Sequence, residues 1–273
     1  MTGPTIAILG ATGNVGDALL LRLAESTLAG AEVSAYASRS MRQPTVEFAG
    51  KTLTVRPIAE AVDAAPSLVF SALPSAVALR TVMSFVSRGS LVIDVGNACA
   101  GVFAAPLCLP GVRPIPQLAL ARAGGARTPS APAWLIASVF GPLLPLGAHT
   151  VTGLINLPAN AYGRAATEEL SEQVVATFNL KDPPRRLFAE GLAFDTLPED
   201  ADQGEWSTRE LQAAAEVSEL LGTNLNRVAV QLATQPVFAG MTAALYIRGV
   251  DNAEAVEAAL RDAPGLATAA RMR

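Results

Sequence analysis

A glycine-rich turn near the start of the chain places the strongest constraint on its fold. The turn reads Gly10-Ala11-Thr12-Gly13-Asn14-Val15-Gly16, directly after the apolar run at residues 6–9 and before a helical pattern over 18–23. Glycines let a backbone turn sharply and approach a phosphate, and a helix N-terminus offers free amides and a positive dipole end. Strand, glycine turn and helix in this order predict a dinucleotide-binding unit. The alternative is a tight turn that binds no ligand.

The rest of the first half alternates between strand and helix patterns. The patterns predict strands over 32–37, 67–73 and 90–95 and a helix over 76–88. Short, continuously apolar strands that alternate with helices indicate a parallel sheet covered on both faces. Four prolines between residues 106 and 116 predict an irregular region, and Gly124-Gly125-Ala126-Arg127 is expected to be a hinge or linker.

The second half has a different sequence pattern, with longer helical segments and strands in which apolar and polar residues alternate. Helical spacing covers 133–144, 167–178, 207–221 and 251–261, and strand patterns cover 150–157, 227–233 and 241–248. We therefore predict an α/β protein with two domains. The first, residues 1–127, is a Rossmann-like parallel-sheet domain, and the second, residues 128–273, is an α+β domain.

Composition narrows the class of protein. Of 273 residues, 51% are hydrophobic and 16% are charged, so we expect a large buried core. The net charge is −4, so we expect no nucleic-acid partner. Prolines interrupt the uncharged stretch 128–163, so we expect no membrane span. Because a strand pattern begins within the first residues, we also expect no signal peptide. Cys99 and Cys108 make no disulfide framework, which favours a reducing cytoplasm and buried thiols.

Metal chemistry is not expected, since His149 is the single histidine. The acidic pair Glu168-Glu169 and the run Glu199-Asp200-Ala201-Asp202 are interpreted as solvated surface.

The end of the second predicted strand bears on the choice of cofactor. It reads Tyr36-Ala37-Ser38-Arg39-Ser40, with no carboxylate to accept the 2′-hydroxyl of NAD. A guanidinium flanked by two hydroxyls suits the 2′-phosphate of NADP. The alternative is a solvated arginine.

Motifs over nearly the whole chain resemble those of the aspartate-semialdehyde dehydrogenases, in order and spacing. They are the glycine turn, residues 37–40, Phe70-Ser71-Ala72-Leu73-Pro74-Ser75, 92–94, 163–173, 192–198, 236–240 and 262–265. The resemblance implies a Rossmann-like domain, a C-terminal dimerisation domain, NADP as cofactor and a place in amino-acid biosynthesis. The predicted cofactor-binding residues are Gly10, Thr12, Gly13, Asn14, Val15, Gly16, Ser38, Arg39, Ser40, Ser71 and Ala72.

The same resemblance implies that the family's catalytic side chains are replaced in this chain. Ala133 stands where the family has its nucleophilic cysteine, and Met241 where it has its histidine. The family's glutamine and substrate-binding arginine fall near Leu157 and on Thr234. Ser130 and Thr234 have no candidate base in the sequence, and an unactivated hydroxyl is a poor nucleophile. We therefore predict no catalytic residue.

These observations favour a non-catalytic, NADP-binding homologue that acts as a regulatory or binding homodimer. A mixed dimer with a catalytic relative could form through the same dimerisation surface of the second domain. The alternative is an active NAD(P)-dependent oxidoreductase with other catalytic groups, although no tyrosine is followed four residues on by the lysine of a short-chain dehydrogenase. A purely structural protein is a third reading. The family continues for several dozen residues beyond the position of Arg273, and this segment helps to close the cofactor site, so weak cofactor binding is expected.

Overall fold

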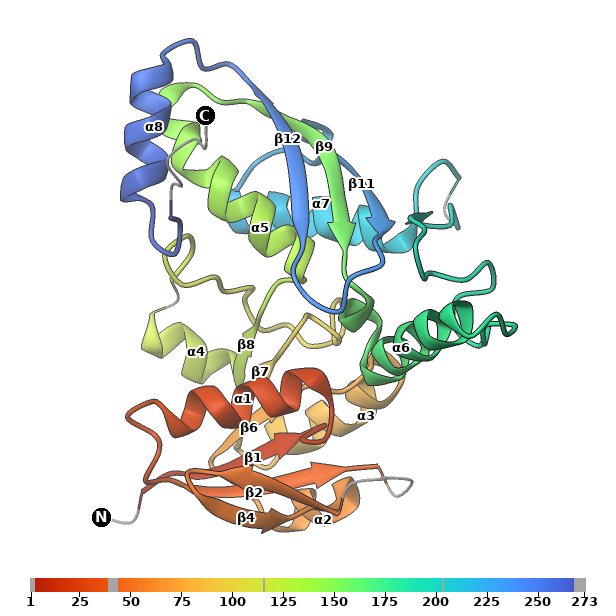
Figure 1. The fold of residues 1–273 in the computed structure, drawn as a ribbon. Coiled ribbons are helices and arrows are strands. Elements are labelled where there is room, and N and C mark those ends of the chain that lie inside the picture. Colours follow the sequence, from red (N-terminus) through yellow and green to blue (C-terminus); the bar gives the residue numbers. More distant parts are fainter. Residues whose placement is uncertain (1–2, 39–43, 115, 203, 268–273) are drawn as a thin grey trace. The chain divides into compact units, whose positions relative to one another are not determined.

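The computed structural model describes residues 3–38, 44–114, 116–202 and 204–267, and these form two compact units (Figure 1). Unit 1 comprises Met1–Cys108 and Pro114–Pro129. Unit 2 comprises Leu109–Arg113 and Ser130–Arg273. The chain is therefore an α/β protein whose first unit carries a parallel sheet and whose second carries a mixed one, as predicted.

Unit 1 is built on a six-stranded sheet in which all neighbouring strands are parallel. In spatial order the strands are β5 (Arg56–Pro57), β2 (Glu32–Ala37), β1 (Thr5–Leu9), β6 (Leu68–Ser71), β7 (Leu91–Asp94) and β8 (Gly125–Arg127). Counted along the chain within this sheet, the order is the 3-2-1-4-5-6 of doubly wound dinucleotide-binding folds. The strand order reverses between β1 and β6, which is where such folds bind ligands.

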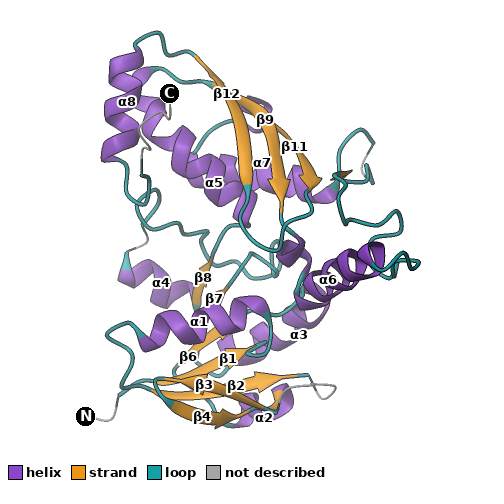
Figure 2. Ribbon diagram, in the orientation of Figure 1, coloured by secondary structure: helices purple, strands orange, loops and turns teal. Residues whose placement is uncertain are grey.

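Alternation along β1 explains why this sheet is buried on both faces. Ala7 and Leu9 enter one hydrophobic cluster with Phe85, while Ile6 and Ile8 enter another with Leu20. Figure 2 shows helices on both sides of the strands. They are α1 (Asn14–Ala24), α2 (Ile58–Asp63), α3 (Ser75–Val86) and α4 (Gln117–Ala123). The predicted parallel sheet with two covered faces is confirmed.

Unit 1 differs from the sequence-based expectations in several parts, which include the unpredicted helices α2 and α4. Residues 124–127 are not a linker: Gly124 ends α4 in a left-handed conformation, and β8 then pairs with β7. A Cβ on Gly125 would lie 1.8 Å from the Val92 carbonyl oxygen, so the glycine permits close strand contact rather than a hinge. The hairpin of β3 (Thr45–Phe48) and β4 (Lys51–Thr54) was not predicted.

Unit 2 is an α+β arrangement around a four-stranded mixed sheet. Its spatial order is β10 (Leu197–Pro198), β11 (Val228–Thr234), β9 (Thr150–Leu157) and β12 (Thr242–Arg248), with β9 and β11 parallel. Its α-helices are α5 (Ala131–Phe140), α6 (Arg164–Phe178), α7 (Thr208–Leu221) and α8 (Ala253–Asp262). Short 3-10 helices cover Gly141–Leu146, Ala159–Tyr162 and Leu225–Arg227.

One face of this sheet forms the core of unit 2. Val151 and Ile155 of β9 pack with Val217 of α7 and Ile136 of α5 in one cluster. The strand's alternate residues point to the other face, where Leu154 is 41% exposed. Its antiparallel neighbour contributes Tyr246, which is 65% exposed. Unit 2 thus presents one packed and one open sheet face.

Candidate functional site

The glycine turn links β1 to α1 at the carboxyl edge of the unit 1 sheet. The amides of Gly10 and Ala11 donate to the Tyr36 carbonyl of β2 at 2.8 and 3.1 Å. Gly10 has a φ of +82°, and a Cβ there would lie 2.6 Å from the Ala72 carbonyl oxygen. A Cβ on Gly16 would lie 2.3 Å from the Gly10 carbonyl oxygen. Both positions therefore require glycine, and the turn is bound to the two neighbouring strands.

The start of α1 has the properties of an anion site. Gly13 precedes the helix, and its lack of a side chain leaves the helix without a side-chain cap. The first-turn amides of Val15 and Gly16 have no acceptor within the helix. Val15 is exposed, and Thr12 and Asn14 are half-buried. This end of α1 offers amides and a positive dipole end to a phosphate.

The other predicted cofactor residues lie at the ends of neighbouring strands. Ser71 ends β6 in register with Leu9 of β1, and the Ala72 amide donates to the Leu9 carbonyl at 2.9 Å. Ser71 is fully buried, and its hydroxyl has no hydrogen-bond partner among the described residues. Ser38 follows β2 and is exposed. Arg39 and Ser40 lie outside the described residues, so their roles stay predictions.

Of the two cysteines, Cys99 does not provide a reactive thiol. Cys99 is buried, as predicted, and its amide donates to Asp94 Oδ2 at 2.8 Å. Burial, together with the nearby Asp94 carboxylate, raises the pKa of the Cys99 thiol to about 12. Burial also raises the pKa of the Asp94 carboxyl group. Cys108 is half-buried and forms no disulfide.

In unit 2, three of the four positions singled out from the sequence lie in one apolar cluster. Ala133 in the first turn of α5 and Leu157 at the end of β9 are fully buried members of it, and Met241 packs against it. Among these three side chains there is no acid, base or nucleophile. His149 is exposed, and its Nδ1 lies 2.9 Å from Thr150 Oγ1.

Ser130 has a carboxylate partner that the sequence did not reveal. Its hydroxyl donates to Glu216 Oε2 at 2.6 Å, and its amide donates to the same oxygen at 2.7 Å. Gln212 donates to Oε1 of the same carboxylate. Glu216 therefore holds the residue that precedes α5, next to the positive end of that helix. The expectation that Ser130 has no basic group nearby is wrong, because α7 brings in a side chain 86 residues away.

Thr234, the fourth position, belongs to a polar cluster. Its hydroxyl lies 2.6 Å from the Tyr162 hydroxyl, which also donates to Glu199 Oε1. Arg209 donates to the same carboxylate oxygen at 3.0 Å, and its guanidinium lies 4.5 Å from the centroid of the Tyr162 ring. Burial and the bond to Glu199 raise the pKa of the Tyr162 hydroxyl, so it stays a hydrogen-bond donor.

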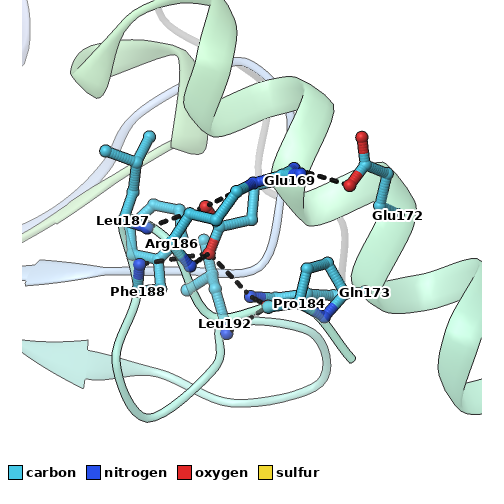
Figure 3. A network of polar contacts seen from close by, with 8 residues as sticks. All are labelled: Glu169, Glu172, Gln173, Pro184, Arg186, Leu187, Phe188 and Leu192. Carbon is cyan, nitrogen blue, oxygen red and sulfur yellow. Dashed lines mark hydrogen bonds and ion pairs between the residues drawn. The ribbon is translucent and has the colours of Figure 1, made fainter. Parts of the chain in front are cut away.

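Two acidic residues expected on the surface are structural instead. Glu199 is only 12% exposed because it pairs with Arg209. Glu169 is fully buried and accepts hydrogen bonds from the amides of Arg186, Leu187 and Phe188 (Figure 3). The surface interpretation was wrong for both, because local charge spacing does not show which distant amides or cations a fold brings near.

Gln173, one turn along α6 from Glu169, extends this network. Its Oε1 accepts from the amides of Leu192 and Ala193, and its Nε2 donates to the Pro184 carbonyl (Figure 3). The Glu169–Gln173 pair thus satisfies five backbone amides of residues 186–193. We call this arrangement the α6 clamp. It fixes a long irregular segment through buried hydrogen bonds.

Within the described residues, no group of three or more histidine, cysteine or acidic side chains is placed to hold a metal ion. The described part of the chain also has no helix long and apolar enough to cross a bilayer.

A doubly wound sheet with an amide-rich glycine turn at its switch point defines unit 1 as a dinucleotide-binding fold. Residues 5–117 match the family model for the semialdehyde dehydrogenase NAD-binding domain. A USG-1 protein homolog from Azotobacter vinelandii is 30% identical over 267 residues, which cover 96% of this chain and 79% of that protein. The chain belongs to the semialdehyde dehydrogenase family.

Relatives named for the enzyme itself are more distant. An aspartate-semialdehyde dehydrogenase from Rickettsia bellii is 24% identical over 266 residues, covering 96% of this chain and 78% of that protein. Aspartate semialdehyde dehydrogenase II from Vibrio cholerae, solved with ASA, has a TM-score of 0.89 at 20% identity, with 97% and 80% of the two chains covered. The Candida albicans enzyme solved with NADP has a TM-score of 0.61 at 19% identity, with 96% and 76% covered. These two structures share the fold of this chain.

Proposed function

We propose that this protein is a non-catalytic member of the semialdehyde dehydrogenase family that binds NADP and has a binding or regulatory role. The observation that carries the proposal is the apolar cluster that contains Ala133, Leu157 and Met241. Attack on an aldehyde needs a nucleophile and a group that takes its proton. None of these three side chains supplies either.

The test is an assay of the unmodified protein with aspartate semialdehyde, phosphate and NADP, followed by NADPH absorbance. A catalytic relative such as the Rickettsia bellii enzyme serves as the positive control. By analogy with a protease that has lost its nucleophile, we expect turnover about 10⁶-fold below that control. Turnover within about a thousandfold of the control contradicts the proposal and favours the active oxidoreductase.

Dinucleotide binding rests on the turn between β1 and α1, where the first-turn amides of Val15 and Gly16 have no acceptor within the helix. The family model of an NAD-binding domain and the relative solved with NADP support it. We propose NADP rather than NAD because Ser38-Arg39-Ser40 follows β2. A ligand at about 100 times its dissociation constant stabilises a protein by about 2.7 kcal/mol. Thermal unfolding with NADP, with NAD and without ligand therefore detects binding.

We further propose a homodimer formed through the open sheet face of unit 2. Leu154 and Tyr246 are exposed there, and large open apolar faces are unusual on monomers. The chain mass is 28.1 kDa, so light scattering at micromolar concentration is expected to report twice that value. A monomer mass contradicts the proposal. A mixed dimer with a catalytic relative would use the same face, and co-purification of the two tagged chains tests for it.

A further inference from the structure

The geometry of unit 2 points to a second ligand site, beside Tyr162, for a small primary ammonium ion with an apolar substituent. The site needs no dinucleotide and no second subunit, so it goes beyond the function proposed above. We call it the Tyr162 pocket. Its volume is about 460 Å³, within the range of small-molecule sites.

The walls of the pocket are apolar and fixed in place. They are formed by Leu187, Phe188, Ala189, Leu197 and Pro198. The Phe188 ring meets the Tyr162 ring edge-on, with the centroids 5.7 Å apart. The α6 clamp holds the amides of Leu187 and Phe188 on the buried Glu169 carboxylate (Figure 3). Because the wall is held by buried hydrogen bonds, a ligand need not order it, which favours binding.

The polar side of the pocket leaves one carboxylate oxygen for a ligand. Tyr162 and Arg209 both donate to Glu199 Oε1. Of the described residues, none donates a hydrogen bond to Glu199 Oε2, although Glu199 lines the pocket and is only 12% exposed. The Thr234 hydroxyl also lines the pocket. A partly desolvated carboxylate with a free oxygen is an acceptor for N–H donors, and hydrogen bonds to charged groups are the stronger ones.

The charge of the pocket selects a cation over an anion. Glu190, Glu199 and Asp200 line it, and none of the described lining residues is a lysine or arginine. Arg209 is paired with Glu199, and Arg185 donates to the Ala189 carbonyl of the wall, but among the described residues neither arginine forms an ion pair with Glu190 or Asp200. An anionic ligand would meet this negative potential without a compensating partner. The apolar walls favour a hydrocarbon substituent on the ammonium group.

Titration calorimetry with three probes of one shape tests the charge preference. Benzylamine is a cation at neutral pH, benzyl alcohol is neutral, and benzoate is an anion. We expect benzylamine to bind at least about tenfold more tightly than the alcohol, and benzoate to show no binding. Binding of benzoate as tightly as benzylamine overturns the proposal, as does an absence of benzylamine binding up to about 10 mM.

Paired variants locate the site. Glu199→Gln is expected to weaken benzylamine binding by about tenfold or more. Glu257→Gln is the matched control, because Glu257 also pairs with an arginine of unit 2 but lies on α8 outside the pocket. Unchanged affinity in a folded Glu199→Gln protein overturns the proposal.

If Glu199→Gln does not fold, the exposed rim residue Asp200 replaces it in the test. Asp200→Asn is expected to weaken benzylamine binding by about twofold to threefold, and added salt should reduce this difference. An affinity that responds to neither change shows that the charge of the pocket does not hold the ligand, and overturns the proposal.

Discussion

The glycine turn of unit 1 and the strand ends of unit 2 differ in how much of the family's chemistry their residues can supply. The turn contains glycine where a side chain would collide with Gly10 or Ala72 backbone atoms, and the amides of Val15 and Gly16 have no acceptor within α1. At the ends of β9 and β11 in unit 2 lie Leu157 and Thr234, where the resemblance predicts that the family's glutamine and arginine are replaced. The proposed function therefore separates binding by backbone amides from catalysis by side chains within one chain.

This difference has a physical origin. A backbone phosphate site depends on conformation, so it persists wherever the turn is retained for packing. A catalytic site depends on a few side chains in one geometry, and it fails when any one of them is replaced. The presence of a fold therefore shows less about activity than the identity of those few residues.

The largest expected effect concerns Ala133→Cys, which restores the thiol alone. We expect turnover to remain about 10⁶-fold below a catalytic relative. Burial in the apolar cluster is expected to raise the pKa of a cysteine at this position. Glu216, the carboxylate at the start of α5, already accepts hydrogen bonds from Ser130 and Gln212, and no imidazole is restored to take the thiol proton. NADPH absorbance measures turnover, and the pH dependence of alkylation at the new cysteine measures its pKa. Activity approaching that of the relative would show that unit 2 still holds a working proton acceptor.

Much of the fold could be predicted from the sequence, and the reason is local. The β2 and β9 segments have the predicted bounds, because apolar runs end at turns or at polar residues. The sequence-based prediction of a linker was wrong at Gly124-Gly125. These glycines end a helix and permit a close strand contact, and a glycine pair of this kind also occurs in linkers. Local patterns do not distinguish a glycine that gives flexibility from one that permits close packing.

The polar contacts of unit 2 could not be predicted, because they join distant parts of the chain. Glu216 and Ser130 are 86 residues apart, and Tyr162 and Thr234 are 72 apart. Glu169 had the appearance of a surface residue in an acidic pair. Its partners are backbone amides, which carry no signal in the sequence. The proposed loss of catalytic residues rests only on resemblance to a family, residue by residue.

The second prediction tests whether the α6 clamp makes unit 2 a rigid scaffold. Glu169→Ala removes a buried carboxylate that accepts from three amides. We expect a loss of about 3–5 kcal/mol in the free energy of unfolding, since the amides are left without an acceptor. Urea unfolding measures it. Glu172→Ala on the exposed side of α6 is the control, with an expected cost of about 0–1 kcal/mol. Equal costs would mean that the α6 clamp adds nothing.

The third prediction tests the turn of unit 1 with a single methyl group. Gly16→Ala places a Cβ 2.3 Å from the Gly10 carbonyl oxygen, so the turn must move. Overpacking of this kind costs about 1–3 kcal/mol of stability. Displacing two amides that bind a phosphate removes about 3–6 kcal/mol, which is a hundredfold or greater loss of NADP affinity. Calorimetric titration measures the affinity. NADP binding that survives in the folded variant would place the phosphate elsewhere.

The smallest expected effect concerns cofactor choice. We expect NADP to bind about tenfold to a hundredfold more tightly than NAD, since one charge-assisted contact to the 2′-phosphate contributes about 1.5–3 kcal/mol. Arg39→Ala should remove most of this preference and leave NAD affinity nearly unchanged. Arg22→Ala is the control, because Arg22 is an exposed arginine of α1 that pairs with Glu25. Titration of both cofactors against the three proteins measures the preference. Equal affinity of the unmodified protein for NADP and NAD would make Arg39 a surface residue, and unit 1 would then bind its cofactor through the glycine turn alone.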